Sequence, residues 1–158
     1  MKNKITIERS ELQQQIDLRN FYMGESAKRK DKDADTIQSS KDDEALLLAF
    51  THTACNELVT AVALRFPSIS YTIDKEKIIF EFETPNDSRS HLLPMLTRSI
   101  IDYLVNETIV HWLLFLRPDL AQSNISLRAS LCSNVLFMFA KMYNIQKIRR
   151  RATNLAGI

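Results

Sequence analysis

Glycine is almost absent from this chain, which has only Gly24 and Gly157 among its 158 residues. Tight turns and glycine-rich loops use this residue because it adopts backbone conformations that a Cβ atom disfavours. The scarcity therefore predicts long helices with few connections. It also disfavours a phosphate-binding loop, in which clustered glycines let the backbone approach the ligand closely. The length suits one domain, residues 1–158, that buries its own core.

The composition is that of an ordinary globular protein, with 45% hydrophobic and 25% charged residues. Cys55 and Cys132 both fall in apolar helical patterns, so we expect buried free thiols in a reducing compartment. Residues 1–9 lack the apolar region of a signal peptide, and the apolar stretch 109–116 is too short to span a bilayer. The sequence thus predicts a protein made in the cytoplasm with no membrane partner.

The N-terminal third predicts a strand, a helix and a long loop. Residues 4–8 alternate between apolar and polar side chains and are rich in β-branched residues, as in a short strand. Ser10 and Gln13 form a capping-box pattern that opens a helix, and Gly24 is its expected end. Residues 25–41 carry dense charges of both signs and little apolar surface, which predicts a flexible loop. This loop is either a solvated linker or an arm that orders on a neighbouring subunit.

The rest of the chain predicts three helices and a β-hairpin. Helices are expected at 43–65, 90–116 and 120–150. Pro94 should lie near the first turn of the second of these helices. The third is apolar around more than half of its circumference. Alternating residues at 69–73 and 78–83 predict a hairpin. An isolated hairpin is marginal, so it must pair with Ile5–Ile7, pack on a helix or join another chain. The fold class is α+β and predominantly α-helical, with four main helices, a hairpin and a short N-terminal strand. Nearly complete burial is expected for Leu58, Leu104 and Leu136.

Candidate chemistry is sparse. His52 and Cys55 lie three residues apart on a predicted helix, but no second pair completes a structural zinc site. Glu107 and His111 lie four apart on one helical face, a spacing that suits acid–base chemistry and equally an intrahelical hydrogen bond. No nucleophile motif is present. We therefore expect no catalytic residues, metal or cofactor, and predict that the protein is not an enzyme.

The charges are distributed unevenly along the chain. No acidic residue follows Asp119, whereas the C-terminal quarter is basic, which indicates an oriented partner surface. A basic tail is expected at 147–158, and its candidate contacts to a partner or DNA are Lys147, Arg149, Arg150 and Arg151. Three interpretations remain open: stabilisation of a helix C-terminus, contact with protein, and contact with nucleic acid phosphates.

The opening segment 5–14, Ile-Thr-Ile-Glu-Arg-Ser-Glu-Leu-Gln-Gln, resembles the start of small virion proteins encoded near the portal gene in tailed phages of gut bacteria, including crAss-like phages. Further similarities are the segment Phe21–Gly24, the stretch Ala54–Asn56, the position of Trp112 and the basic C-terminal helix. The order of these short motifs matches over nearly the whole chain.

This resemblance implies a head–tail connector, a structural ring protein of the phage neck that joins the portal to the tail. Its copies would form a homo-oligomeric ring around the DNA channel, in contact with the portal protein and other neck or tail proteins. The expected location is the virion, at the head–tail junction. The alternative is a small helical regulatory or nucleic-acid-binding protein that uses the basic C-terminal helix.

The segments expected at intersubunit contacts are the charged loop and the hairpin. A hairpin short of partners can add strands across subunits, and a charged arm can reach a neighbour. The candidate residues are Lys28, Arg29, Lys30, Tyr71, Phe80 and Phe82.

Overall fold

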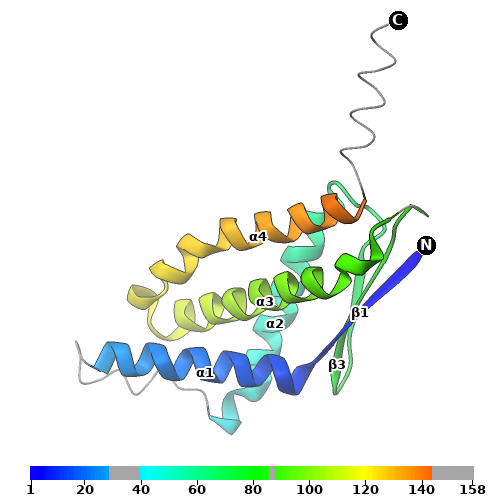
Figure 1. The fold of residues 1–158 in the computed structure, drawn as a ribbon. Helices are drawn as coiled ribbons and strands as arrows, with labels where there is room; N and C mark the ends of the chain where they lie inside the picture. Colours follow the sequence, from blue (N-terminus) through cyan, green and yellow to red (C-terminus); the bar gives the residue numbers. More distant parts are fainter. Residues whose placement is uncertain (29–39, 86–87, 144–158) are drawn as a thin grey trace, which may run out of the picture.

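The computed structural model describes residues 1–28, 40–85 and 88–143, which form four helices and a small sheet (Figure 1). The chain runs in the order β1 (Lys2–Glu8), α1 (Arg9–Lys28), α2 (Glu44–Ala63), β2 (Ser70–Ile73), β3 (Lys77–Glu83), α3 (Leu93–Leu116) and α4 (Gln122–Met142). Short 3-10 helices precede α2, α3 and α4. The predicted α+β, mostly helical fold class is confirmed.

The three strands form an antiparallel sheet in the order β1-β3-β2. Ile5 of β1 lies opposite Phe80 of β3, and Tyr71 of β2 lies opposite the same residue on the other side. Side chains of β1 alternate strictly between exposed and buried, so one face of the sheet covers the core. The predicted hairpin is confirmed, and of the partners considered for it the N-terminal strand is the one that pairs with it.

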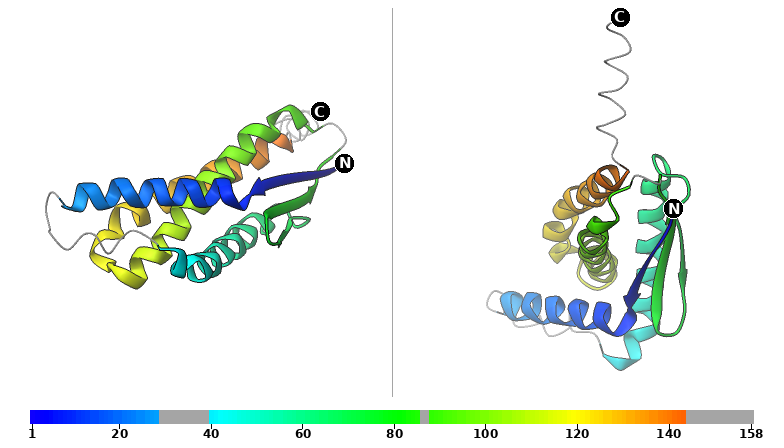
Figure 2. Two further views of the ribbon diagram at one scale, coloured as in Figure 1. Left: turned by 90° about the horizontal axis from the view of Figure 1, so that it is seen from below. Right: turned by 45° about the vertical axis from the view of Figure 1, so that its right-hand side comes forward.

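Helix α3 is the centre of the domain. It lies between α1 and α4 in Figure 1 and in the right-hand view of Figure 2, and α2 crosses it beside the sheet. More than half of its residues are buried, among them Trp112 and Leu104. Pro94 lies in its first turn, as predicted, where a missing N–H costs no helical hydrogen bond.

Helices α2 and α3, the latter with its preceding 3-10 turn, are long and apolar enough to cross a bilayer by length and composition alone. The expectation from residues 109–116 therefore underestimated the apolar length. In the described structure, however, two-thirds of the apolar window in α3 is buried within the domain. Packing against α1, α2 and α4 accounts for the apolar character of α3.

Helix α1 corrects two sequence-based predictions. It begins at Arg9, directly after β1, and it continues past Gly24 to Lys28. Leu12, Ile16, Asn20 and Gly24 follow one another at four-residue spacing, and all four are buried. Gly24 therefore extends the packed stripe of the helix, where tertiary contacts outweigh the roughly 1 kcal/mol cost of a helical glycine. The predicted loop 25–41 is thus helical up to Lys28, and residues 29–39 lie outside the described part.

The inner face of α4 also differs from the prediction. Leu58 and Leu104 are fully buried as expected, but Leu136 is only partly buried. The core face consists of Val135, Met138, Phe139 and Met142. Leu127 and Phe137 are about half exposed, so within the described structure α4 is covered on one side and not on two.

The turn between β2 and β3 gives a pH-dependent prediction. Oδ1 of Asp74 accepts backbone hydrogen bonds from Glu76 (2.8 Å) and Lys77 (2.7 Å), which hold the pKa of Asp74 below its usual range. A depressed folded-state pKa stabilises the fold above the unfolded-state pKa, and this contribution is lost as the pH falls through the folded-state pKa. Asp74→Ala should therefore destabilise the protein at neutral pH, and the difference from the unmodified protein should diminish towards the acid end.

Urea unfolding at a series of pH values measures this effect. Glu76→Ala is the matched control because it removes a carboxylate from the same turn, whereas only the backbone N–H of Glu76 takes part in the bonds to Asp74. Equal pH profiles for the two variants would contradict the assignment to Asp74.

Candidate functional site

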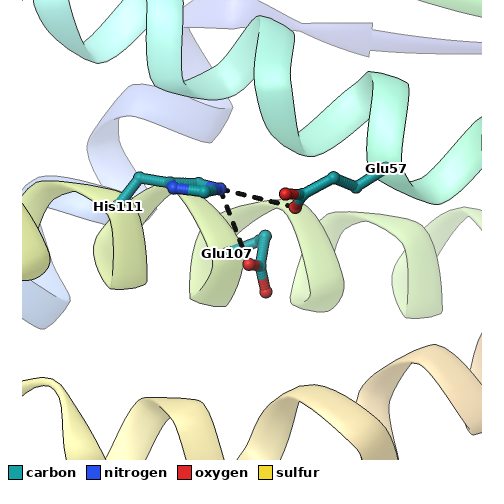
Figure 3. Close-up of side chains that lie close together, drawn as sticks. All are labelled: Glu57, Glu107 and His111. Atoms are coloured by element: carbon teal, nitrogen blue, oxygen red, sulfur yellow. Dashed lines mark hydrogen bonds and ion pairs between the residues drawn. The ribbon is translucent and has the colours of Figure 1, made fainter.

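A buried carboxylate, Glu107 of α3, lies at the centre of a charged cluster shared by three helices. Its side chain has no exposed surface, and both its oxygens accept hydrogen bonds from the guanidinium group of Arg128 on α4. One turn further along α3, His111 places Nε2 3.6 Å from Oε1 of Glu107 and 3.4 Å from Oε2 of Glu57 on α2 (Figure 3). We call Glu57, Glu107, His111 and Arg128 the charged cluster.

Arg128 is the partner that makes burial of Glu107 tolerable. An ionised carboxylate withdrawn from water is costly unless it is paired and hydrogen-bonded. The guanidinium contributes two hydrogen bonds, and those bonds in turn raise the pKa of Arg128. The pair therefore fixes the position of α4 against α3 at this point.

The neighbours of the cluster respond to its burial and charge. Burial, followed by the nearby Glu107 and Glu57 carboxylates, raises the pKa of Tyr103. Burial and the same Glu107 carboxylate raise the pKa of Cys132. Burial alone raises the pKa of Cys55 to about 12. Both cysteines are free, but only Cys55 is fully buried as predicted, and raised pKa values disfavour the reactive thiolate at either position.

The cluster is better suited to charge pairing and ion binding than to acid–base catalysis by Glu107. Because Glu107 is fully buried and paired with Arg128, a substrate proton does not reach its oxygens in this conformation. The side chains of His111 and Glu57 are 21% and 42% exposed, so they form the open side of the cluster. Glu57, Glu107 and His111 also offer three metal-ligating atoms within 4.8 Å of one another.

A hollow of about 380 Å³ lies where the start of α1, the start of α2 and the hairpin turn meet. Arg9 crosses this region and donates hydrogen bonds to the carbonyl oxygens of Asp74 and Lys75. Side chains of both charges line it, including Glu8, Glu44 and Lys75. The arrangement ties α1 to the hairpin and presents no set of convergent groups selective for one ligand.

Large apolar side chains are exposed on several helices, including Met95, Leu114 and Phe115 of α3, and two groups of them lie on α1 and α4. On α1, Leu18, Phe21 and Tyr22 are each about half exposed or more, and the two aromatic rings lie 5.8 Å apart. On α4, Leu127 and Phe137 are about half exposed, and Nζ of Lys141 lies 4.4 Å from the centre of the Phe137 ring. We call these the α1 face and the α4 face. They belong to helices on opposite sides of α3 (Figures 1 and 2).

The hairpin residues that were predicted to contact a neighbouring subunit instead pack within the same chain. Phe80 and Phe82 are buried in the domain's own core, at 0% and 2% exposure, so their side chains cannot contact a neighbour. Tyr71 is partly buried, and its hydroxyl group donates to Oδ1 of Asn56 on α2 at 2.8 Å. The alternation of β3 was recognised correctly, but its apolar face is covered by helices of the same chain.

The edges of the sheet also give limited support to strand addition. Among the described strands, β1 and β2 each pair with β3 alone. Alternate backbone groups of β1 bond to β3, which directs the others to the open edge: those of Lys2, Lys4, Thr6 and Glu8. Charged side chains, lysine especially, are typical of edge strands that avoid pairing with other chains.

The structure brings together some of the remaining site residues predicted from the sequence and separates others. Glu107 and His111 are brought together as the spacing suggested, whereas Nδ1 of His52 lies 3.2 Å from the Tyr71 hydroxyl, and Cys55 is buried in the core. Lys28 is the last residue of α1. The other basic candidates lie outside the described residues: Arg29, Lys30, Lys147, Arg149, Arg150 and Arg151.

Sequence reasoning missed Glu57 and Arg128 as members of the cluster. They lie 54 and 21 residues from their partners, His111 and Glu107, and no local spacing joins them. The one available signal is that Arg128 is the first basic residue after the last acidic residue of the chain. No family model, curated protein or solved structure matches this chain.

Proposed function

We propose that this protein is a structural assembly protein whose copies associate head to tail into a ring, in the role of a head–tail connector of a tailed phage. The observation that carries the proposal is that the exposed apolar residues of the α1 face and of the α4 face belong to helices on opposite sides of α3. A ring requires two different complementary surfaces on each subunit, whereas a two-fold dimer uses one surface twice.

The two helices differ in charge, since α1 contains three acidic and three basic residues and α4 contains basic residues alone. The exposed side chains of α1 include Glu11, Asp17 and Glu25. Helix α4 contains no acidic residue, and it presents Lys141 beside Phe137. Opposite charges around apolar centres favour contact between unlike faces and disfavour contact between like faces. The α1 face of one copy therefore packs against the α4 face of the next in the proposed ring.

The connector role itself rests on the resemblance of residues 5–14 to the start of small virion proteins encoded near the portal gene in tailed phages. In this role the ring surrounds the DNA channel, and portal and tail proteins contact its two ends. Repetition of one modest contact around a closed ring stabilises the assembly as a whole. The basic tail at 147–158, beyond the described residues, supplies a further contact to protein or to DNA.

Site-directed disulfide crosslinking tests the head-to-tail contact. Two proteins are prepared in a Cys132→Ser background, one carrying Tyr22→Cys and the other Phe137→Cys, and they are oxidised separately and as a mixture. We expect the mixture to form a crosslinked dimer that neither protein forms alone. A chain carrying both cysteines should form a ladder of linear and closed oligomers.

Leu64→Cys in place of Tyr22→Cys is the matched control, because Leu64 is 85% exposed at the end of α2 and belongs to neither face. Equal crosslinking with this control, or self-crosslinking of either single variant, would refute head-to-tail association.

The connector role has a separate test: the chain should be found in the neck of purified particles. If DNA binding that depends on salt and on Arg149–Arg151 were found without particle association, the regulatory alternative would replace it.

A further inference from the structure

We propose that Glu57, Glu107 and His111 form a binding site for a divalent transition metal of the zinc class. The ion would join α2 to α3 at Oε1 of Glu107, an oxygen that also accepts a hydrogen bond from Arg128. The inference is independent of the proposed assembly role, since it concerns a single copy of the chain.

His111 and Glu57 form a long hydrogen bond at 3.4 Å, and the distances between the ligand atoms also fit a shared ion. Nε2 of His111 lies 3.4 Å from Glu57 Oε2 and 3.6 Å from Glu107 Oε1. Strong N–H···O bonds are shorter, at about 2.7–3.2 Å. Zinc binds nitrogen and carboxylate oxygen at about 2.0–2.2 Å, and in a tetrahedron these bond lengths separate neighbouring ligands by roughly 3.3–3.6 Å. The third pair of ligand atoms also lies within 4.8 Å, and the partly exposed side chain of Glu57 would move towards Glu107 when an ion binds.

The charge balance of the cluster favours a cation. Two carboxylates face one guanidinium and one imidazole, which leaves an excess of negative charge when the imidazole is neutral. A carboxylate oxygen has two lone pairs, so Oε1 of Glu107 can accept from Arg128 and still ligate an ion. Metal-ligating carboxylates are commonly held by such a second hydrogen-bonding partner. Arg128 is therefore a positioning residue for the ligand atom of Glu107.

The site is accessible from one side only. Glu107 is completely buried, whereas His111 and Glu57 are partly exposed, so an ion would enter from their side and keep water at its remaining position. Phe50 of α2 stacks on the His111 ring, with centroids 5.9 Å apart, and limits its orientation. One imidazole with two carboxylates suits zinc and its neighbours, whereas magnesium and calcium prefer oxygen ligands throughout.

Calorimetric titration with Zn²⁺ and absorption spectroscopy with Co²⁺ test the site on the full chain. We expect one equivalent to bind, with the visible Co²⁺ bands of tetrahedral coordination and a rise in Tm that a chelator reverses. His111→Ala and Glu57→Gln should each weaken binding at least tenfold while the fold remains intact, because both residues are on the open side. His52→Ala is the matched control, since it removes a helical histidine outside the cluster and should leave binding unchanged.

Two results would overturn the proposal. The first is a titration in which Zn²⁺ gives no heat of binding and Co²⁺ gives no tetrahedral spectrum. The four residues would then form an ion-pair network only. The second is binding that survives both His111→Ala and Glu57→Gln, which would place the ion elsewhere. Neither result affects the crosslinking of the α1 and α4 faces, so failure of the metal site is distinguishable from failure of the assembly role.

Discussion

Phe139→Ala should lower the free energy of unfolding by about 3–5 kcal/mol, whereas Phe137→Ala, on the same helix, should lower it by only about 0.5 kcal/mol. Phe139 is fully buried, and its ring lies 5.0 Å from that of Phe82 on β3 and 5.5 Å from that of Phe66 after α2. Removing it opens a cavity between α4, the sheet and the end of α2. Phe137 is 54% exposed, so its loss removes little buried surface.

Urea unfolding followed by circular dichroism measures both effects, with the midpoint compared at constant m-value. The pair is well matched, because both substitutions exchange phenylalanine for alanine and lie two residues apart. The α4 face predicts a second difference: Phe137→Ala should weaken contact between copies, although it hardly changes the stability of one copy. Equal destabilisation by the two substitutions would mean that α4 packs with a different face than the structure shows.

Arg128→Met should destabilise the fold by about 3 kcal/mol, since it leaves the fully buried Glu107 carboxylate without its partner. This magnitude is at the low end for a broken buried pair because the Arg128 side chain is 41% exposed and water can partly replace it. The double variant Glu107→Leu with Arg128→Met should recover most of the loss, because neither charge then remains buried and unpaired. The double-mutant cycle should thus give a coupling of at least about 1 kcal/mol.

Arg98→Met is the control for removal of an arginine from an ion pair. Arg98 lies 3.2 Å from Asp102 at i,i+4 spacing, but its side chain is 62% exposed, so the substitution should cost about 0.5 kcal/mol or less. The measurement is again urea unfolding at neutral pH. If Arg128→Met were as mild as Arg98→Met, Glu107 would be stabilised by groups other than the guanidinium.

Local sequence patterns were sufficient to locate the main helices and strands and to bring together Glu107 and His111 of the charged cluster. Alternation of apolar residues located β1, β2 and β3, and helical spacing placed Glu107 and His111 on one face of α3. These features depend on the conformation of a few consecutive residues, and side-chain periodicity reports that conformation directly.

Predictions that depended on which residues pack against a given face were wrong more often. Phe80 and Phe82 were expected at a subunit contact, but helices of the same chain cover them. Gly24 was expected to end α1, but it extends the stripe that α1 packs inward. For Phe80 and Phe82 the local signal was correct about conformation and silent about what lies against the face. For Gly24 it was wrong about conformation, because the helix continues to Lys28.

The sequence by itself determined which segments are helices and strands, because those preferences arise from backbone sterics and from the spacing of apolar side chains. Only the tertiary structure decided that Glu57 and Arg128 meet Glu107 and His111, and that the α1 and α4 faces lie on opposite sides of α3. The docking of helices depends on the complementarity of whole surfaces, to which many residues distant in sequence contribute small amounts of free energy. No short motif predicts the total of these contributions. The residues of the proposed metal site and of the proposed contact between copies could therefore be identified only from the packed helices.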